Sequence, residues 1–251
     1  MSNLSRLVSR DQKLYPETQV GGFSRVDGGI EFYSRVRALL TPESRVLDFG
    51  AGRGRAAEDP VAYRRGLRAL RGSVAEVVGV DIDEAVMSNP MVDRAVVVNN
   101  SRELPFETES FDLIVADWVF EHLDDPVEVG RELWRILKPG GWICARTPNR
   151  WGTTSIGARI VPNRFHVAAL RRVQPMRKSF DVFPTRYRLN TPKQLRRAFP
   201  PAQFDHFTYT YESHPAYAGG SYIAGRCFQA IGAVTPPPLR RTFMVFLRRR
   251  A

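Results

Sequence analysis

Short apolar runs recur through the first 150 residues and are separated by stretches of mixed polarity. A helical stretch from Val61 to Arg71 separates two of them. An almost uninterrupted apolar run suits a strand that is buried on both faces, as in a parallel sheet. Strands that alternate with helical stretches predict a doubly wound α/β fold. The predicted strands lie near residues 45–49, 76–80, 95–98, 111–116 and 142–146.

The helix after the fourth run has the clearest boundaries. Asp125 can cap its start, and Pro126 occupies the first turn, where the missing N–H costs nothing. We expect Gly140 or Gly141 to end it, with Lys138 near its negative end. The apolar positions are Val127, Leu133, Ile136 and Leu137, and those expected to face water are Glu128, Arg131, Glu132 and Arg135.

The first run leads into an acidic residue and three glycines at alternate positions. Asp48 is followed by Gly50, Gly52 and Gly54, and a helical segment comes next. Bare backbone at such a turn can touch a bound ligand, because side chains at the glycines would block the approach. The dinucleotide fingerprint G-x-G-x-x-G would need its third glycine where Arg55 stands. The turn therefore predicts a ligand site of another kind.

The second run ends in an acid, Asp81. In a parallel sheet this acid lies beside the end of the first strand, where its carboxylate can accept hydrogen bonds from both hydroxyls of a ribose. Asp48, at the end of the first strand, needs polar partners, because an unpaired buried carboxylate costs several kcal/mol. Asp81 therefore predicts a ligand that contains a ribose.

Further motifs follow in a characteristic order. They are Leu104-Pro105-Phe106, the strand from Phe111 to Asp117, Glu121-His122-Leu123 and Leu137-Lys138-Pro139-Gly140-Gly141. Together with the glycine turn and Asp81, this series resembles the class I S-adenosylmethionine-dependent methyltransferases, in the small-molecule branch with a type 11-like domain. The resemblance covers about residues 43–149.

The resemblance implies a seven-stranded, Rossmann-like sheet that is mostly parallel with an antiparallel C-terminal strand. Phe204–Tyr211 and Thr242–Leu247 would form its edge pair. It divides the chain into an N-terminal helical segment (1–42), a cofactor-binding core (43–149) and a C-terminal part (150–251) of the same domain. Residues 150–200 and 212–240 lie outside this plan, and we expect them to form a cap over the substrate.

The resemblance also implies S-adenosyl-L-methionine as the cofactor. The family usually has an acid near the end of the third strand to accept from the adenine amino group, but Asn100 holds that place here. An amide oxygen can accept the same hydrogen bond without charge assistance. The cofactor-binding residues are expected to be Asp48, Gly50, Ala51, Gly52, Gly54, Asp81, Ile82, Asn100, Ser101 and Asp117.

Three residues are candidates for proton transfer: Glu121, His122 and His166. A base is needed only when the acceptor is a hydroxyl or a protonated amine, and it works best with a pKa near neutrality. For His122 the alternative is a structural role at the start of a helix. The cofactor motifs report on the donor and say little about the acceptor.

Charge is distributed unevenly along the chain. Residues 1–149 hold 19 Lys/Arg and 23 Asp/Glu, whereas residues 150–251 hold 18 and 3. The acidic part suits a sulfonium cation, and the basic part suggests an anionic partner. A solvated face rich in arginine would give the same counts.

We expect a small or lipid-linked acceptor, such as a glycan or polyprenyl-phosphate intermediate. RNA methylation and a non-catalytic, cofactor-binding regulatory subunit stay open as alternatives.

Two features bear on location. No run of about 18 apolar residues exists, so we expect no membrane-spanning helix. The first 30 residues lack a hydrophobic signal core, which predicts a cytoplasmic protein. The basic part and the apolar segment from Tyr217 to Val234 would allow peripheral contact with an acidic membrane at its inner face.

Cys144 and Cys227 are too few for a disulfide framework or a metal site, so we expect no metal.

Overall fold

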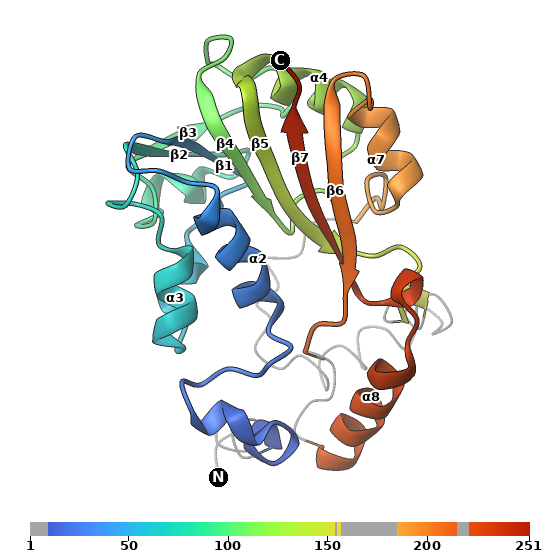
Figure 1. Ribbon diagram of the computed structural model, residues 1–251. Coiled ribbons are helices and arrows are strands. Elements are labelled where there is room, and N and C mark those ends of the chain that lie inside the picture. Colours follow the sequence, from blue (N-terminus) through green and yellow to red (C-terminus); the bar gives the residue numbers. More distant parts are fainter. Residues whose placement is uncertain (1–9, 154, 157–184, 215–220) are drawn as a thin grey trace. The chain divides into compact units, whose positions relative to one another are not determined.

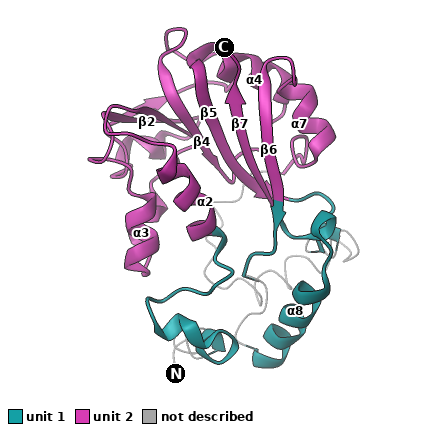
Figure 2. Cartoon of the chain, viewed as in Figure 1, with its two compact units in different colours: residues 1–28, 149–184, 210–242 teal, residues 29–148, 185–209, 243–251 magenta. Residues whose placement is uncertain are grey.

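The computed structural model describes residues 10–153, 155–156, 185–214 and 221–251 (Figure 1). The chain forms two compact units, shown in different colours in Figure 2. Unit 1 comprises residues 1–28, 149–184 and 210–242, and unit 2 comprises residues 29–148, 185–209 and 243–251. Residues 29–42 belong to unit 2, and the expected division of the chain at residues 42 and 149 stays a prediction.

Unit 2 is built on a seven-stranded sheet with the strand order β3-β2-β1-β4-β5-β7-β6 (Figure 1). Strands β1 to β5 pair in parallel. Strand β7 lies between β5 and β6 and runs antiparallel to both (Figure 1). The predicted α/β fold is thus confirmed. The strands are β1 Arg45–Phe49, β2 Glu76–Asp81, β3 Arg94–Val97, β4 Phe111–Asp117, β5 Leu137–Pro148, β6 Phe204–Tyr211 and β7 Thr242–Arg249.

Helices connect the strands and follow local capping signals. Asp125 caps α4, where its side chain accepts from the backbone N–H of Glu128, and Pro126 occupies the first turn as predicted. Thr191 caps α7 in the same way through the N–H of Gln194. The helical elements of unit 2 include α2 Gly28–Ala38, η2 Arg55–Glu58, α3 Ala62–Arg68, η3 Glu84–Ser88, α4 Pro126–Ile136 and α7 Pro192–Ala198. Those of unit 1 include η1 Pro16–Gln19, α8 Tyr222–Val234 and η5 Pro237–Leu239.

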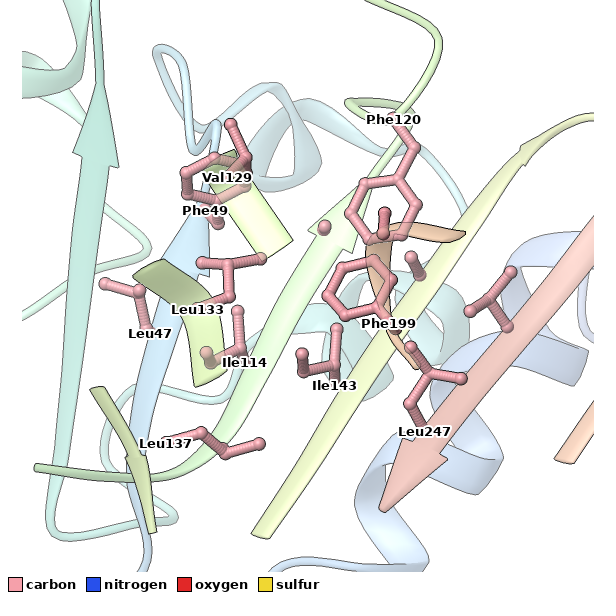
Figure 3. Packing of buried hydrophobic residues seen from close by; sticks show 14 of the residues in the cluster. Leu47, Phe49, Ile114, Phe120, Val129, Leu133, Leu137, Ile143, Phe199 and Leu247 are labelled. Carbon is pink, nitrogen blue, oxygen red and sulfur yellow. The ribbon is translucent and has the colours of Figure 1, made fainter. Parts of the chain in front are cut away.

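Apolar side chains fill both faces of the sheet, as the uninterrupted runs require. On one face, Ile114 and Ile143 pack with Leu133 of α4 and Phe199, which follows α7 (Figure 3). Neighbouring strand residues point the other way. On that second face, Phe246 of β7 contacts Phe32 of α2, with ring centroids 5.8 Å apart. Helices therefore cover both faces, which is the doubly wound arrangement.

Two expectations about α4 and its surroundings were wrong. The helix ends at Ile136 and not at Gly140 or Gly141, because β5 begins at Leu137, paired with Phe111 of β4. The register then shifts, and Gly140 supports the bulge with a φ of +78°. Glu132 does not face water: it is buried and accepts a hydrogen bond of 2.7 Å from the N–H of Leu104.

The helix expected over Val61–Arg71 is shorter, spanning Ala62–Arg68. Within the described ranges, no helix is both long and apolar enough to cross a bilayer. Part of the first expected cap segment, residues 154 and 157–184, lies outside the described residues, as do residues 215–220 of the second. That the two segments cover the substrate stays a prediction.

Candidate cofactor site

The glycine turn after β1 is tied to the next strand of the sheet. Gly50, Gly52 and Gly54 all have positive φ, at +76°, +50° and +73°. Glycine adopts this conformation at little cost, whereas other residues are strained in it. The N–H groups of Gly50 and Ala51 donate to the carbonyl oxygen of Val80, at 2.8 and 3.2 Å. A Cβ at Gly52 would meet no atom within 4 Å, so open space lies beside the turn at that position.

Asp81, the last residue of β2, contacts the glycine turn directly. Its Oδ2 accepts a hydrogen bond of 2.8 Å from the N–H of Gly52, and its Oδ1 accepts one of 2.9 Å from the N–H of Asp83. The sequence predicts this proximity, because parallel neighbours β1 and β2 end at the same edge of the sheet. Ile82 follows, with 57% of its surface exposed. The Asp81 carboxylate and the exposed Ile82 side chain therefore follow each other next to the glycine turn.

Asn89 stabilises the glycine turn through hydrogen bonds to its backbone, and none of the motifs in the sequence contains this residue. Its Nδ2 donates to the carbonyl oxygens of Ala51 and Gly52, both at 3.1 Å, and its Oδ1 accepts from the N–H of Met91 at 2.8 Å. The side chain is buried, and a Cβ at Gly54 would lie 2.1 Å from its Oδ1. The only signal in the sequence is an Asn-Pro pair, which by itself indicates a turn.

Asp48 lies at the end of β1, between β2 and β4. Burial, followed by the negative charges of Asp117 and Asp81, raises the pKa of Asp48 to about 7, although Arg68 opposes this shift. A cation placed beside this carboxyl would favour its ionised form. The acidic strand ends therefore suit a positively charged ligand.

Asp117, at the end of β4, is already occupied by protein partners. Arg146 binds both of its carboxylate oxygens, and Tyr33 Oη donates to its Oδ2 at 3.2 Å. Arg68 lies 3.5 Å from the same oxygen. Burial alone would raise the pKa of Asp117, but the charge of Arg146 and these hydrogen bonds hold it below its usual value. Asp117 is thus part of an internal network, and a direct contact with the cofactor stays a prediction.

Trp118 follows Asp117 in a conformation that is rare for a bulky residue. Its φ is +62°, and 40% of its surface is exposed. Its N–H donates to the carbonyl oxygen of Arg146 at 3.0 Å, and the Arg146 guanidinium lies 5.4 Å from its ring centroid. These contacts hold a strained, partly exposed aromatic side chain at the carboxyl edge of the sheet.

Glu121 and His122 lie in the turn after β4. The Glu121 carboxyl is buried, and its Oε2 accepts from Thr147 Oγ1 at 2.8 Å. Thr147 in turn accepts from Asn190 Nδ2 at 2.8 Å. Burial raises the pKa of Glu121 to about 7. His122 Nε2 lies 3.9 Å from Glu121 Oε1, and the imidazole is 26% exposed. A buried carboxyl thus lies next to a more accessible histidine.

The remaining candidates differ in their surroundings. Asn100 Oδ1 accepts from the N–H groups of Arg102 and Glu103, at 2.9 and 3.2 Å. Both of its acceptor positions are used, so a bond to an adenine amino group would have to replace one. Ser101 lies next to it in the same loop and is half-buried. His166 lies outside the described residues. Among the described residues, no cluster of side chains could hold a metal ion.

The chain is similar to known methyltransferases. Residues 47–145 match the family model for a methyltransferase domain. A protein of Mycolicibacterium smegmatis, described as a "probable S-adenosylmethionine-dependent methyltransferase", is 35% identical over 135 residues. That match covers 51% of this chain and 47% of the relative, so the chain spans about half the length of the mycobacterial relative it matches. Residues 47–145 therefore form a class I S-adenosylmethionine-dependent methyltransferase domain.

Two other proteins are similar to the methyltransferase domain and its flanks. The malonyl-[acyl-carrier protein] O-methyltransferase of Methylococcus capsulatus is 29% identical over 185 residues, covering 68% of this chain and 62% of the relative. The crystal structure of a SAM-dependent methyltransferase from Thermotoga maritima superposes with a TM-score of 0.54 at 17% identity and covers 99% of each chain. The structural likeness supports the fold.

The residues of the methyltransferase domain fit this cofactor on chemical grounds. A sulfonium and an ammonium are cations, and Asp48 lies in an acidic setting. A ribose needs acceptors for its two hydroxyls, and Asp81 presents a carboxylate at the edge of the turn. An amino-acid group can approach the turn at Gly52, where a Cβ would meet no protein atom.

Proposed function

We propose that the chain is an S-adenosylmethionine-dependent methyltransferase that acts on a small or lipid-linked molecule. The observation that carries the proposal is the 2.8 Å hydrogen bond from the N–H of Gly52 to Asp81, which joins the glycine turn to the acid at the end of β2. A turn of bare backbone and a carboxylate that can accept from ribose hydroxyls are thereby brought together. When bound, S-adenosyl-L-methionine supplies a methyl group on a reactive sulfonium.

The roles of the cofactor residues follow from their chemistry. Gly50, Gly52 and Gly54 receive the amino-acid group against the backbone, and the buried Asp48 carboxyl near the end of β1 favours the cationic groups. Asp81 accepts from the ribose hydroxyls, and the exposed Ile82 packs on the adenine. Ala51 lies in the glycine turn, and Asn100, Ser101 and Asp117 complete the proposed set of cofactor-binding residues.

Calorimetric titration with S-adenosylhomocysteine tests the cofactor site. The wild-type chain should bind, and Asp81→Ala should bind at least about tenfold more weakly, because it loses a charge-assisted acceptor. Asp205→Ala is the matched control. Asp205 lies on β6, and its exposed carboxylate pairs with Arg250. Absence of binding by the wild-type chain, or equal losses in the two variants, would contradict the proposal.

Proton removal from the acceptor is assigned to His122, with Glu121 behind it. The imidazole is the more accessible of the two, and its Nε2 lies 3.9 Å from the buried Glu121 carboxyl. Trp118 offers an exposed ring beside the same strand end for contact with the acceptor. Correct positioning of acceptor and methyl group alone can lower the activation barrier by on the order of 7–11 kcal/mol. A base is needed in addition only for acceptors that must lose a proton. A changed pH profile of kcat in Glu121→Gln, with KM unaltered, tests this assignment.

The acceptor class rests on charge and on the relatives. Residues 150–251 carry 18 Lys/Arg and 3 Asp/Glu, which favours an anionic acceptor such as a lipid-linked phosphate or a glycan intermediate. One relative is an O-methyltransferase of malonyl-[acyl-carrier protein], whose acceptor is a small group on a carrier. A screen with methyl-labelled cofactor against lipid, glycan and RNA fractions tests this class.

Labelled RNA with a steep salt dependence would favour the alternative of an RNA methyltransferase. Cofactor binding without label in any fraction would favour a regulatory subunit that does not transfer methyl groups.

A further inference from the structure

Helix α8 exposes the apolar side of its sequence. In a helix of 3.6 residues per turn, the exposed residues fall on one continuous half of the circumference. Within this half, Ile223 and Val234 are 76% and 80% exposed, and Tyr222 and Ile231 are 45% and 46% exposed. The single charged residue there is Arg226. The exposed half consists of Tyr222, Ile223, Arg226, Cys227, Ala230, Ile231, Ala233 and Val234.

The opposite half of α8 consists of Ala224, Gly225, Phe228, Gln229 and Gly232 and is anchored within unit 1. A Cβ at Gly225 would lie 2.3 Å from Leu14 Cδ1, so only glycine allows this close approach. Gln229 Nε2 donates to the carbonyl oxygen of Leu14 at 2.7 Å. Ser221 caps the helix through the N–H of Ala224. The helix is thus held with its apolar half outward, the reverse of a helix that faces water.

The charge of unit 1 indicates what covers this half. By sequence, unit 1 includes 14 Lys/Arg and 5 Asp/Glu, and 7 and 4 of these belong to the residues that the structure describes, so both counts give a net positive charge. An apolar strip on a unit of net positive charge suits a lipid bilayer, which has an apolar interior and can have an anionic surface. A second copy of the chain would bring the same positive charge and would be repelled.

We propose that the exposed half of α8 docks the chain on an anionic lipid bilayer. The helix has 13 residues and is therefore about 20 Å long, too short for a hydrocarbon core of about 30 Å. It lies in the plane of the interface, with Ile223, Ile231 and Val234 in the acyl region and Arg226 at the headgroups. This inference concerns the location of the chain and does not depend on the proposed reaction.

Vesicle flotation tests the proposal, with vesicles of phosphatidylcholine alone or mixed in equal parts with phosphatidylglycerol. The full chain should float with the mixed vesicles and not with phosphatidylcholine, and added salt should weaken binding. The double variant Ile223→Ser/Val234→Ser should bind roughly tenfold more weakly or worse, because it loses two inserted side chains. Val20→Ser is the matched control: Val20 is 79% exposed in the same unit but lies outside α8, and its loss should change nothing.

Cys227 provides a second readout. It lies on the exposed half of α8, whereas Cys144 is buried, so a thiol-reactive, polarity-sensitive dye will attach at Cys227. The dye emission should shift to the blue on addition of mixed vesicles, while far-ultraviolet circular dichroism shows that the double variant folds. No flotation, an equal effect of Val20→Ser, or a blue shift with dimer formation in the absence of lipid would overturn the proposal.

Discussion

Asn89 Nδ2 donates a hydrogen bond of 3.1 Å to the carbonyl oxygen of Gly52, whose own N–H donates to Asp81. The peptide groups around Gly52 are therefore held from two elements that lie far from it in the chain. A second bond from Asn89 reaches Ala51. The shape of the glycine turn depends on a side chain that the glycine motif does not contain.

Replacement of Asn89 should weaken cofactor binding. Asn89→Ala removes both donors and leaves the two carbonyl oxygens without them, which should raise the Kd for S-adenosylhomocysteine roughly tenfold to a hundredfold. Asn89→Asp keeps the acceptor that Met91 uses but cannot donate, so it should lose affinity to a similar degree. Titration calorimetry of the three proteins measures this, and unchanged affinity in Asn89→Asp would show that the donors do not shape the turn.

Gly54→Ala should destabilise the chain by roughly 2–5 kcal/mol, since it combines a left-handed φ with a clash against Asn89. Gly72 has a φ of +78° and open space around it, so Gly72→Ala measures the backbone cost alone. Gly66 is exposed inside α3, and Gly66→Ala should stabilise by about 0.5–1 kcal/mol. Urea unfolding gives all three values. Equal effects at Gly54 and Gly72 would contradict the clash.

Asp48 should make the fold less stable as the pH rises. Its pKa is about 7 in the folded chain and near 3.8 when unfolded, so between these values the unfolded state ionises while the folded state stays protonated. The free energy of unfolding should fall across this range and level off above pH 7. Asp48→Asn removes this term, so it should match the wild type near pH 4 and exceed it at pH 8. A constant difference at every pH would contradict the raised pKa.

The pair formed by Arg146 and Asp117 should be costly to break. Both side chains are largely buried, so Arg146→Met removes the main partner of a buried carboxylate, leaves it only the contacts with Tyr33 and Arg68, and should cost about 3–5 kcal/mol. The exposed pair of Arg131 and Glu128 serves as the control, and Arg131→Met should change stability by less than about 0.5 kcal/mol. Adding Asp117→Asn to Arg146→Met should recover part of the loss, because Tyr33 and Arg68 then need to balance no carboxylate charge. A loss in Arg146→Met as small as in the control would contradict the assignment.

Replacement of Gly130 should lower the stability of the fold without changing its affinity for the cofactor product. A Cβ there would lie 2.3 Å from the carbonyl oxygen of Ala198, because α4 and α7 pack backbone to backbone at this point. Gly130→Ala should therefore cost roughly 1–3 kcal/mol. The affinity of the folded variant for S-adenosylhomocysteine should stay unchanged, since the glycine turn is made by other elements. Loss of affinity in a variant of normal stability would show that α4 contributes to the site.

Local patterns in the sequence determined the elements and part of the site. The apolar runs predict β1 to β5, and Asp125 with Pro126 predicts the start of α4. Asp81 could be placed beside the glycine turn, because parallel strands adjacent in the sheet end at one edge. These features depend on residues close in sequence or on a rule of sheet geometry, so periodicity and spacing are enough to find them.

Tertiary structure alone decided the features that depend on distant partners. The pairing of Leu137 with Phe111 ends α4 earlier than its glycines suggest. Arg146 and Tyr33 occupy Asp117, which the sequence left open to the ligand. The outward turn of the apolar half of α8 follows from the close fit of Gly225 on Leu14. Each of these contacts joins residues that lie far apart along the chain, and local hydrophobic patterns carry no information about such pairs.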